Sequence, residues 1–101
     1  MSKKTKSMVE SIKVYFASQP VLQAWLFGSF SRGEERTDSD VDILVTLDKD
    51  AHVGLLKFSG MRLELEQILQ RRVDLVVDGT LIPCAVESVN KDKMLIYERS
   101  Q

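Results

Sequence analysis

Hydrophobic positions recur at two different spacings along this chain, and the spacings predict its helices and strands. Apolar residues three or four apart predict an amphipathic helix over residues 6–18, which Pro20 ends. Its apolar positions are Met8, Val9, Ile12, Tyr15 and Phe16. The same spacing predicts a longer helix over residues 53–70, with an inner side formed by Leu55, Phe58, Met61, Leu65, Ile68 and Leu69. Gly60 interrupts that helix and marks a close contact or a bend.

Shorter apolar runs predict the strands. They cover residues 21–27, 40–47 and 71–77, and a run at 94–97 is a candidate fourth strand at an edge. Pro83 suits the first turn of a short helix that reaches about residue 90. This order predicts one α/β (α+β) domain over residues 1–101, with a small mixed β-sheet of three to four strands. The helices pack on one face, and the other face is left open as a cleft.

The turn after the first strand has the chemistry of a phosphate site. Gly28 ends the apolar run and can adopt a backbone conformation that other residues avoid. Ser29 can cap a short helical turn over residues 30–32, and Gly33 closes it. Unpaired N–H groups and the positive end of a small dipole then face outward, an arrangement that binds phosphate.

Acidic residues follow on the second and third strands. Asp40 and Asp42 point to the same face of a strand, roughly 7 Å apart along it. Their oxygens can converge on one Mg²⁺ ion or on a pair of ions ~4 Å apart. Asp74 is the single charge inside the later apolar run 73–77. It completes a three-carboxylate cluster if that strand lies beside the second one.

These residues together resemble a known family. A Gly-Ser pair at 28–29, Asp-x-Asp at 40–42 with Arg-Gly between them, and Val-Asp-Leu-Val at 73–76 resemble the nucleotidyltransferase superfamily that includes DNA polymerase beta. The runs 28–34 and 38–45 resemble more closely the minimal nucleotidyltransferases of bacteria and archaea. The resemblance covers nearly the whole chain.

The resemblance implies the nucleotidyltransferase fold and a set of residue roles. Gly28 and Ser29 would bind the triphosphate, and Arg32 would assist at a phosphate or pack locally. Asp40, Asp42 and Asp74 would be the catalytic residues and the metal ligands, holding two Mg²⁺ ions, and Mn²⁺ suits the same oxygen ligands.

The resemblance also implies a reaction and a partner. Minimal nucleotidyltransferases are often encoded beside a small helical HEPN protein, and several such pairs behave as antitoxin and toxin. Some of the antitoxins transfer AMP from ATP to a tyrosine of the HEPN ribonuclease. We therefore expect a metal-dependent transfer of AMP from ATP to a hydroxyl, most simply a tyrosine of a cognate HEPN toxin, by a type VII-like antitoxin.

Two alternatives from other classes stay open at this point. One is an antitoxin that keeps the nucleotide site but neutralises its toxin by steric contact alone. The other is a small-molecule nucleotidyltransferase whose cleft is completed by a homo-oligomer or by another subunit. Taken singly, a Gly-Ser pair is only a turn, and Asp-x-Asp is often a solvated strand edge.

Charge and composition narrow the remaining classes. A net charge of -1 gives no general attraction to nucleic acid or to an anionic membrane. No apolar stretch approaches the roughly 20 residues that span a bilayer, and no signal-peptide pattern opens the chain, so we expect a cytoplasmic protein. Cys84 is the single cysteine and His52 the single histidine, which excludes an intrachain disulfide and a Cys/His zinc site.

Overall fold

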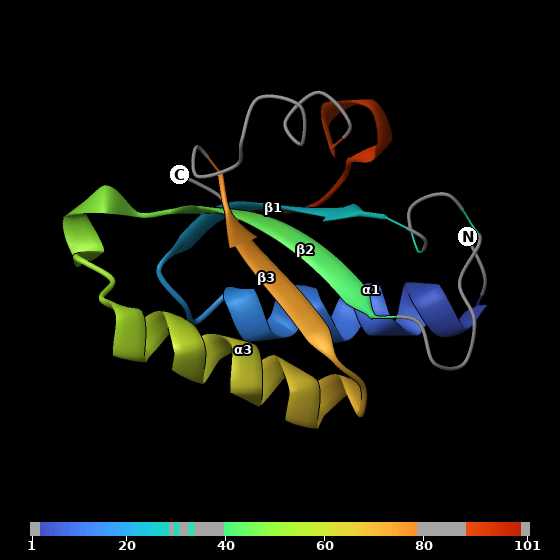
Figure 1. Cartoon of the computed structure of the whole chain (residues 1–101), viewed down its shortest axis with the longest axis horizontal. Coiled ribbons are helices and arrows are strands. Elements are labelled where there is room, and N and C mark those ends of the chain that lie inside the picture. Colours follow the sequence, from blue (N-terminus) through green and yellow to red (C-terminus); the bar gives the residue numbers. More distant parts are fainter. Residues whose placement is uncertain (1–2, 29, 31–32, 34–39, 79–88, 100–101) are drawn as a thin grey trace.

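Two long helices lie against one face of a four-stranded sheet (Figure 1). The computed structural model describes residues 3–28, 30, 33, 40–78 and 89–99. Its elements are α1 (Lys3–Phe16), β1 (Val21–Phe27), β2 (Val41–Leu47), the 3₁₀ turn η1 (Lys49–Ala51), α3 (Leu55–Leu69), β3 (Val73–Val77) and β4 (Met94–Glu98). The predicted mixed α/β architecture is confirmed, and the 3₁₀ turn is an addition that the sequence pattern did not indicate.

The strands stand in the order β3-β2-β1-β4. β1 pairs antiparallel with both β2 and β4, whereas β2 and β3 pair in parallel. The sheet is therefore mixed, as expected. A parallel pair cannot be joined by a tight turn, and α3 supplies the crossover between β2 and β3.

The core lies between the sheet and the two helices. Residues from all four strands are buried there together with the apolar side of α1. The core residues with 0% exposure are Ile12, Phe16, Val21, Ala24, Leu26, Val41, Ile43, Val45, Met61 and Leu65. The other positions of the central strands, Asp42 among them, point to the opposite face. Because side chains alternate along β2, its core residues and Asp42 point to opposite faces of the sheet.

The predicted inner side of α3 is wrong at two positions. Leu55 is 80% exposed and Ile68 is 46% exposed, while only Met61 and Leu65 are buried. Phe58 and Leu69 are partly buried against the core. The reason is that α3 packs mainly against β3 and α1, so only a narrow stripe of the helix meets other elements.

Gly60 is likewise not explained by a close contact. A Cβ built at Gly60 would meet no heavy atom within 4 Å. Space therefore does not require a glycine at this position of α3.

Two predicted segments fall largely outside the described residues. Of the turn 30–32, only Phe30 is described, and it is helical. Of the short helix expected from Pro83 to about residue 90, only the end is described, where residues 89–92 are helical. Among the described helices, none is long and apolar enough to cross a membrane.

An ion pair ties the end of β4 to the end of β2. Arg99 Nη1 donates to Asp48 Oδ2 at 2.8 Å, and Arg99 Nη2 donates to the carbonyl of Gln19 at 3.0 Å. Asp48 also accepts from the backbone N–H of Asp50 at 3.0 Å and so caps the 3₁₀ turn. These donors, the Arg99 guanidinium first, hold the pKa of the Asp48 carboxyl below its usual value.

Replacing Gly60 by alanine should stabilise the protein. The free energy of unfolding should rise by roughly 0.5–1 kcal/mol, because alanine costs less backbone entropy inside a helix and the added methyl group meets open space. Urea unfolding measures this. The matched control is Gly54→Ala, which also adds a methyl group in open space but at the N-cap of α3, where alanine is a poor residue. A loss of stability in Gly60→Ala would contradict the conclusion that the added methyl group meets open space.

The Asp48–Arg99 pair should make stability depend on pH. Because the folded pKa of Asp48 is depressed, its contribution is present above the unfolded value of about 3.9 and is lost as pH falls through the folded value. Asp48→Asn keeps a good capping residue but removes the charge. It should be less stable than the parent at pH 7, and the difference should shrink below about pH 4. A difference that is equal at pH 7 and pH 3 would rule out the charge as its cause.

Candidate functional site

The two central acids of the candidate site are neighbours across the parallel strands. Asp42 on β2 and Asp74 on β3 are register partners, with Val41 opposite Val73 and Ile43 opposite Leu75. The flanking valines, isoleucine and leucine are buried, so the two aspartates share the opposite face of the sheet. The condition stated from the sequence, that the strand of Asp74 lies beside the second one, is met. Asp74 is exposed, and Asp42 is partly buried.

Asp40 lies just outside the strand that was predicted to include it. β2 begins at Val41, and Asp40 precedes it as an exposed residue. Among the described residues, no three histidine, cysteine, aspartate or glutamate side chains lie close enough together to hold a metal ion. The strands thus bring Asp42 and Asp74 side by side, but the three side chains do not form a closed cluster. Like charges repel, so carboxylates turn apart unless a cation draws them together.

Gly28 stands against the Asp42 carboxylate. It follows directly after Phe27, the register partner of Asp42, and its φ of +74° lies in the left-handed region that favours glycine. A Cβ at this position would overlap Asp42 Oδ2 and would lie 3.1 Å from Asp42 Cγ. The turn needs glycine for two reasons, its conformation and the space that the carboxylate occupies. A group bound at this turn would lie beside Asp42.

Phe30 anchors the same turn in the core. It is 4% exposed and belongs to the hydrophobic cluster beneath the sheet. The guanidinium of Arg71 lies over its ring, 5.2 Å from the centroid. Sequence reasoning did not single out either residue. A lone apolar residue between serines was the available signal for Phe30, because such a residue in a polar loop is usually buried.

The remaining predicted residues of the turn cannot be placed. Ser29 and Arg32 lie outside the described residues. Their assignment to a nucleotide therefore stays a prediction from the sequence.

The carboxylate face is not open along its whole length. Leu44 follows Asp42 on this face and is 1% exposed. Its register partners are Trp25 on β1 and Val76 on β3. Lys93 Nζ lies over the Trp25 ring, 4.8 Å from the centroid. The predicted open cleft therefore does not extend over the middle of the sheet, where Leu44 is buried. The exposed part of this face lies toward Asp40 and Asp74.

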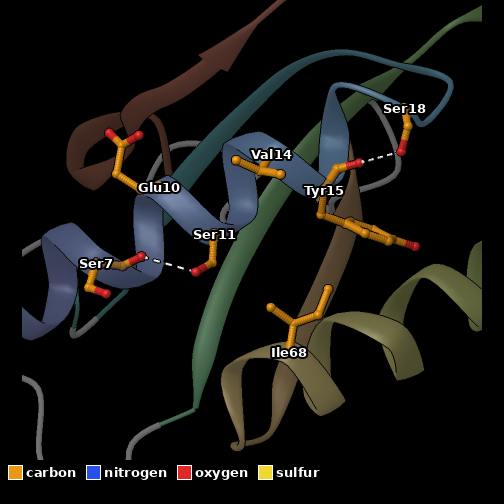
Figure 2. Close-up of a pocket in the computed structure, with 7 residues that line it drawn as sticks. All are labelled: Ser7, Glu10, Ser11, Val14, Tyr15, Ser18 and Ile68. Carbon is orange, nitrogen blue, oxygen red and sulfur yellow. Dashed lines mark hydrogen bonds between the residues drawn. The ribbon is translucent and has the colours of Figure 1, made fainter.

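A groove of about 580 Å³ lies on the other side of the molecule, between α1 and α3 (Figure 2). Figure 2 shows Ile68 pointing from α3 toward α1, below Val14 and Tyr15. The hydroxyls of Ser11 and Ser18 donate to the carbonyls of Ser7 and Tyr15, so neither is prepared as a nucleophile. Its lining includes Glu10, which pairs with Lys13 at 3.5 Å. The groove is formed on the helical side and shares no residue with the carboxylate site.

Tyr15 is the groove residue whose pKa is shifted. Its hydroxyl is buried and lies near Glu64 of α3. Burial, and then the nearby negative charge of Glu64, raise the pKa of Tyr15 to about 12. The tyrosine hydroxyl therefore stays protonated at physiological pH.

The carboxylate site suits a hard divalent cation and a phosphate. Asp42 and Asp74 provide carboxylate oxygens at the same height of two strands, and Asp40 lies next along the chain. Oxygen ligands of this kind select Mg²⁺ or Mn²⁺ over softer metals. The glycine turn against Asp42 adds a place where backbone approaches closely. The residue types of the site suit a divalent cation with a bound phosphate, although the carboxylates among the described residues do not form a closed cluster.

Comparison with known proteins agrees with this chemistry. The family described as nucleotidyltransferase domain matches residues 8–97. The protein adenylyltransferase MntA of Thermococcus cleftensis is 48% identical over 61 residues, which are 60% of each chain. This chain thus covers less than two thirds of that relative's length. A protein of Methanocaldococcus jannaschii, provisionally named a protein adenylyltransferase, is 36% identical over 73 residues, 71% of each chain.

Solved structures share the fold. One that is provisionally described as a minimal nucleotidyltransferase is 32% identical, with a TM-score of 0.74 over 88% of this chain and 89% of that one. Another contains a tri-AMPylated HEPN toxin of Shewanella oneidensis in complex with an MNT antitoxin. Its TM-score is 0.64 at 17% identity, over 95% of this chain and 71% of that one. At that identity the likeness shows the fold alone.

Two glycine substitutions should separate backbone strain from the contact with Asp42. Gly28 and Gly33 have nearly equal φ values of +74° and +72°, but a Cβ at Gly33 meets nothing within 4 Å. Gly33→Ala should therefore lose only about 1–2 kcal/mol in the free energy of unfolding. Gly28→Ala should lose about 1–3 kcal/mol more, because Asp42 must move. Chemical denaturation measures the free energy of unfolding of both variants. Equal losses would show that the Asp42 carboxylate moves aside at no cost in stability.

Proposed function

The chain belongs to the nucleotidyltransferase domain family, and from this premise we propose that it transfers AMP from ATP to a tyrosine hydroxyl of a HEPN toxin. In this role it is a metal-dependent protein adenylyltransferase and an antitoxin. The observation that carries the proposal is the register that sets Asp42 beside Asp74, with Gly28 packed against the Asp42 carboxylate. This arrangement joins a phosphate-binding turn to an acidic cation site.

The triphosphate would bind at the turn. Gly28 keeps the turn close to the Asp42 carboxylate, and Ser29 would contribute its N–H group and hydroxyl to the phosphates. Arg32 is the candidate for a further phosphate contact. A side chain at position 28 would displace Asp42, so the turn and the acids act as one unit.

The acids would hold the divalent ions. The register partners Asp42 and Asp74 would be the central ligands, and Asp40 would be the third. When bound, Mg²⁺ or Mn²⁺ supplies charge neutralisation at the phosphates and lowers the pKa of the attacking hydroxyl. Asp74 is exposed on the edge strand β3, where it can also accept the proton of the incoming hydroxyl.

The bond changes follow from this placement. The tyrosine oxygen attacks the α-phosphorus and loses its proton, and the bond from that phosphorus to the pyrophosphate oxygen breaks. The products are AMP joined to the tyrosine oxygen and free pyrophosphate. The protein forms no covalent bond itself, and its contribution is positioning and electrostatic stabilisation.

A protein acceptor is supported by the kinds of proteins that resemble this chain. The relatives from Thermococcus cleftensis and Methanocaldococcus jannaschii carry protein adenylyltransferase names. The similar fold from Shewanella oneidensis stands in a complex with an AMPylated HEPN toxin. The exposed position of Asp74 on an edge strand also suits an acceptor delivered by another protein.

Removing the charge of Asp42 should abolish transfer. The cognate HEPN protein, incubated with this chain, ATP and Mg²⁺, should gain mass in units of AMP, as measured by intact-mass spectrometry. Asp42→Asn should reduce the rate at least about 100-fold, because a metal ligand is lost while the side-chain volume is kept. Circular dichroism checks that the variant is folded.

Asp78→Asn provides the matched control. It makes the same chemical change just beyond the far end of β3, at an exposed residue, and should leave transfer unchanged. Normal transfer by a folded Asp42→Asn would overturn the proposal. A stable complex with no mass gain would favour the steric antitoxin, and transfer to a soluble hydroxyl compound without HEPN protein would favour the small-molecule enzyme.

A further inference from the structure

The junction between α3 and β3, residues 70–72, contacts the start of β2 and Phe30 of the turn, and it leads directly into β3. At its start, Gln70 adopts a left-handed conformation, with φ of 56°, that ends α3. At its end, the backbone N–H of Val73 donates to Glu66 Oε2 at 3.0 Å, and β3 begins. The junction is thereby held to the helix from which it leaves. Asp74 follows directly.

The same junction also sets the start of β2. The backbone N–H of Val41 donates to the carbonyl of Arg72 at 2.9 Å. Val41 lies between Asp40 and Asp42, so this bond places both acids relative to Asp74. Glu66 itself pairs with Arg62 at 3.3 Å, one turn earlier on α3.

The third contact of the junction reaches the turn. The Arg71 guanidinium covers the ring of Phe30 at 5.2 Å, and the ring is 4% exposed. The carbonyl of Phe30 accepts from the backbone N–H of Gly33 at 3.4 Å. Phe30 stands two residues after Gly28, the residue packed against Asp42. Fixing this ring therefore limits how far the turn can move from the acid.

We propose that Arg71 is a positioning residue that holds the nucleotide-binding turn against Asp42 by covering Phe30. The inference deepens the proposed function and rests on it for the identity of the ligand. The guanidinium suits this task because its planar face stacks on an aromatic ring, whereas the lysine ammonium is a compact point charge. Arg71 needs no contact with the reacting atoms for this role.

The proposal is tested by two readouts on the same variants. Hydrogen exchange measures the protection of amides in residues 28–33, with those of β1 and β2 as internal reference. The AMP-transfer assay with the HEPN protein gives KM for ATP and kcat separately. In Arg71→Met, exchange in the turn should become about 3- to 10-fold faster, and KM should rise by a similar factor with kcat nearly unchanged.

The variants are chosen so that charge, stacking and position can be distinguished. Arg71→Lys keeps the charge and should fall between the parent and Arg71→Met. Phe30→Leu keeps an apolar side chain but removes the ring, and in that background Arg71→Met should have no further effect on exchange. Arg72→Met is the matched control, because the described contact of the exposed Arg72 runs through its main-chain carbonyl.

The outcomes separate this inference from the proposed function. If Arg71→Met matches Arg72→Met in both readouts while the parent transfers AMP, the inference fails and the function stands. If exchange in the turn rises as expected but the parent transfers no AMP, Arg71 still positions the turn and the proposed function fails. Faster exchange in β1 and β2 as well as in the turn would show a general loss of stability and would also overturn the inference.

Discussion

The parallel pairing of β2 and β3 decides how the helices, the core and the two acids are arranged. Two neighbouring parallel strands need a crossover, and α3 makes it on the face already occupied by α1 (Figure 1). Every strand therefore turns one set of alternate side chains toward the helices. The other set is released, and in β2 and β3 it presents Asp42 and Asp74 at the same height. One pairing thus creates both the core and the acidic pair.

The close approach of Gly28 to Asp42 follows from the antiparallel pairing on the other side of β2. Phe27 is the register partner of Asp42, so the residue after it must turn beside the carboxylate. Only glycine accepts the positive φ there without strain and leaves room for the oxygen. The turn therefore follows β1, and the acid lies on β2, which pairs with β1. Sites built on such rigid elements keep their geometry better than sites on loops alone.

The hydrophobic core lies on the helical face of the sheet, and the candidate site lies on the opposite face. The α3–β3 junction has contacts with both. Glu66 on the helical side accepts from Val73, Arg72 accepts from Val41, and Arg71 covers Phe30. A local change in α3 can therefore reach the acids through these three contacts. In the groove between α1 and α3, the side-chain contacts given for Ser11, Ser18 and Glu10 among the described residues stay within α1 and the turn after it.

Local spacing predicted the strand at 21–27 and the start of the next strand to within one residue, because one chain reveals its own periodicity. Its motifs singled out Gly28, Asp42 and Asp74, but neither Phe30 nor Arg71. Tertiary structure alone decided that Asp42 stands opposite Asp74, that Arg71 covers Phe30, that Leu44 is buried, and that Leu55 and Ile68 are exposed. The physical reason is that periodicity shows which side of an element is apolar. Which neighbour covers that side, and in what register, depends on contacts between residues far apart in the chain.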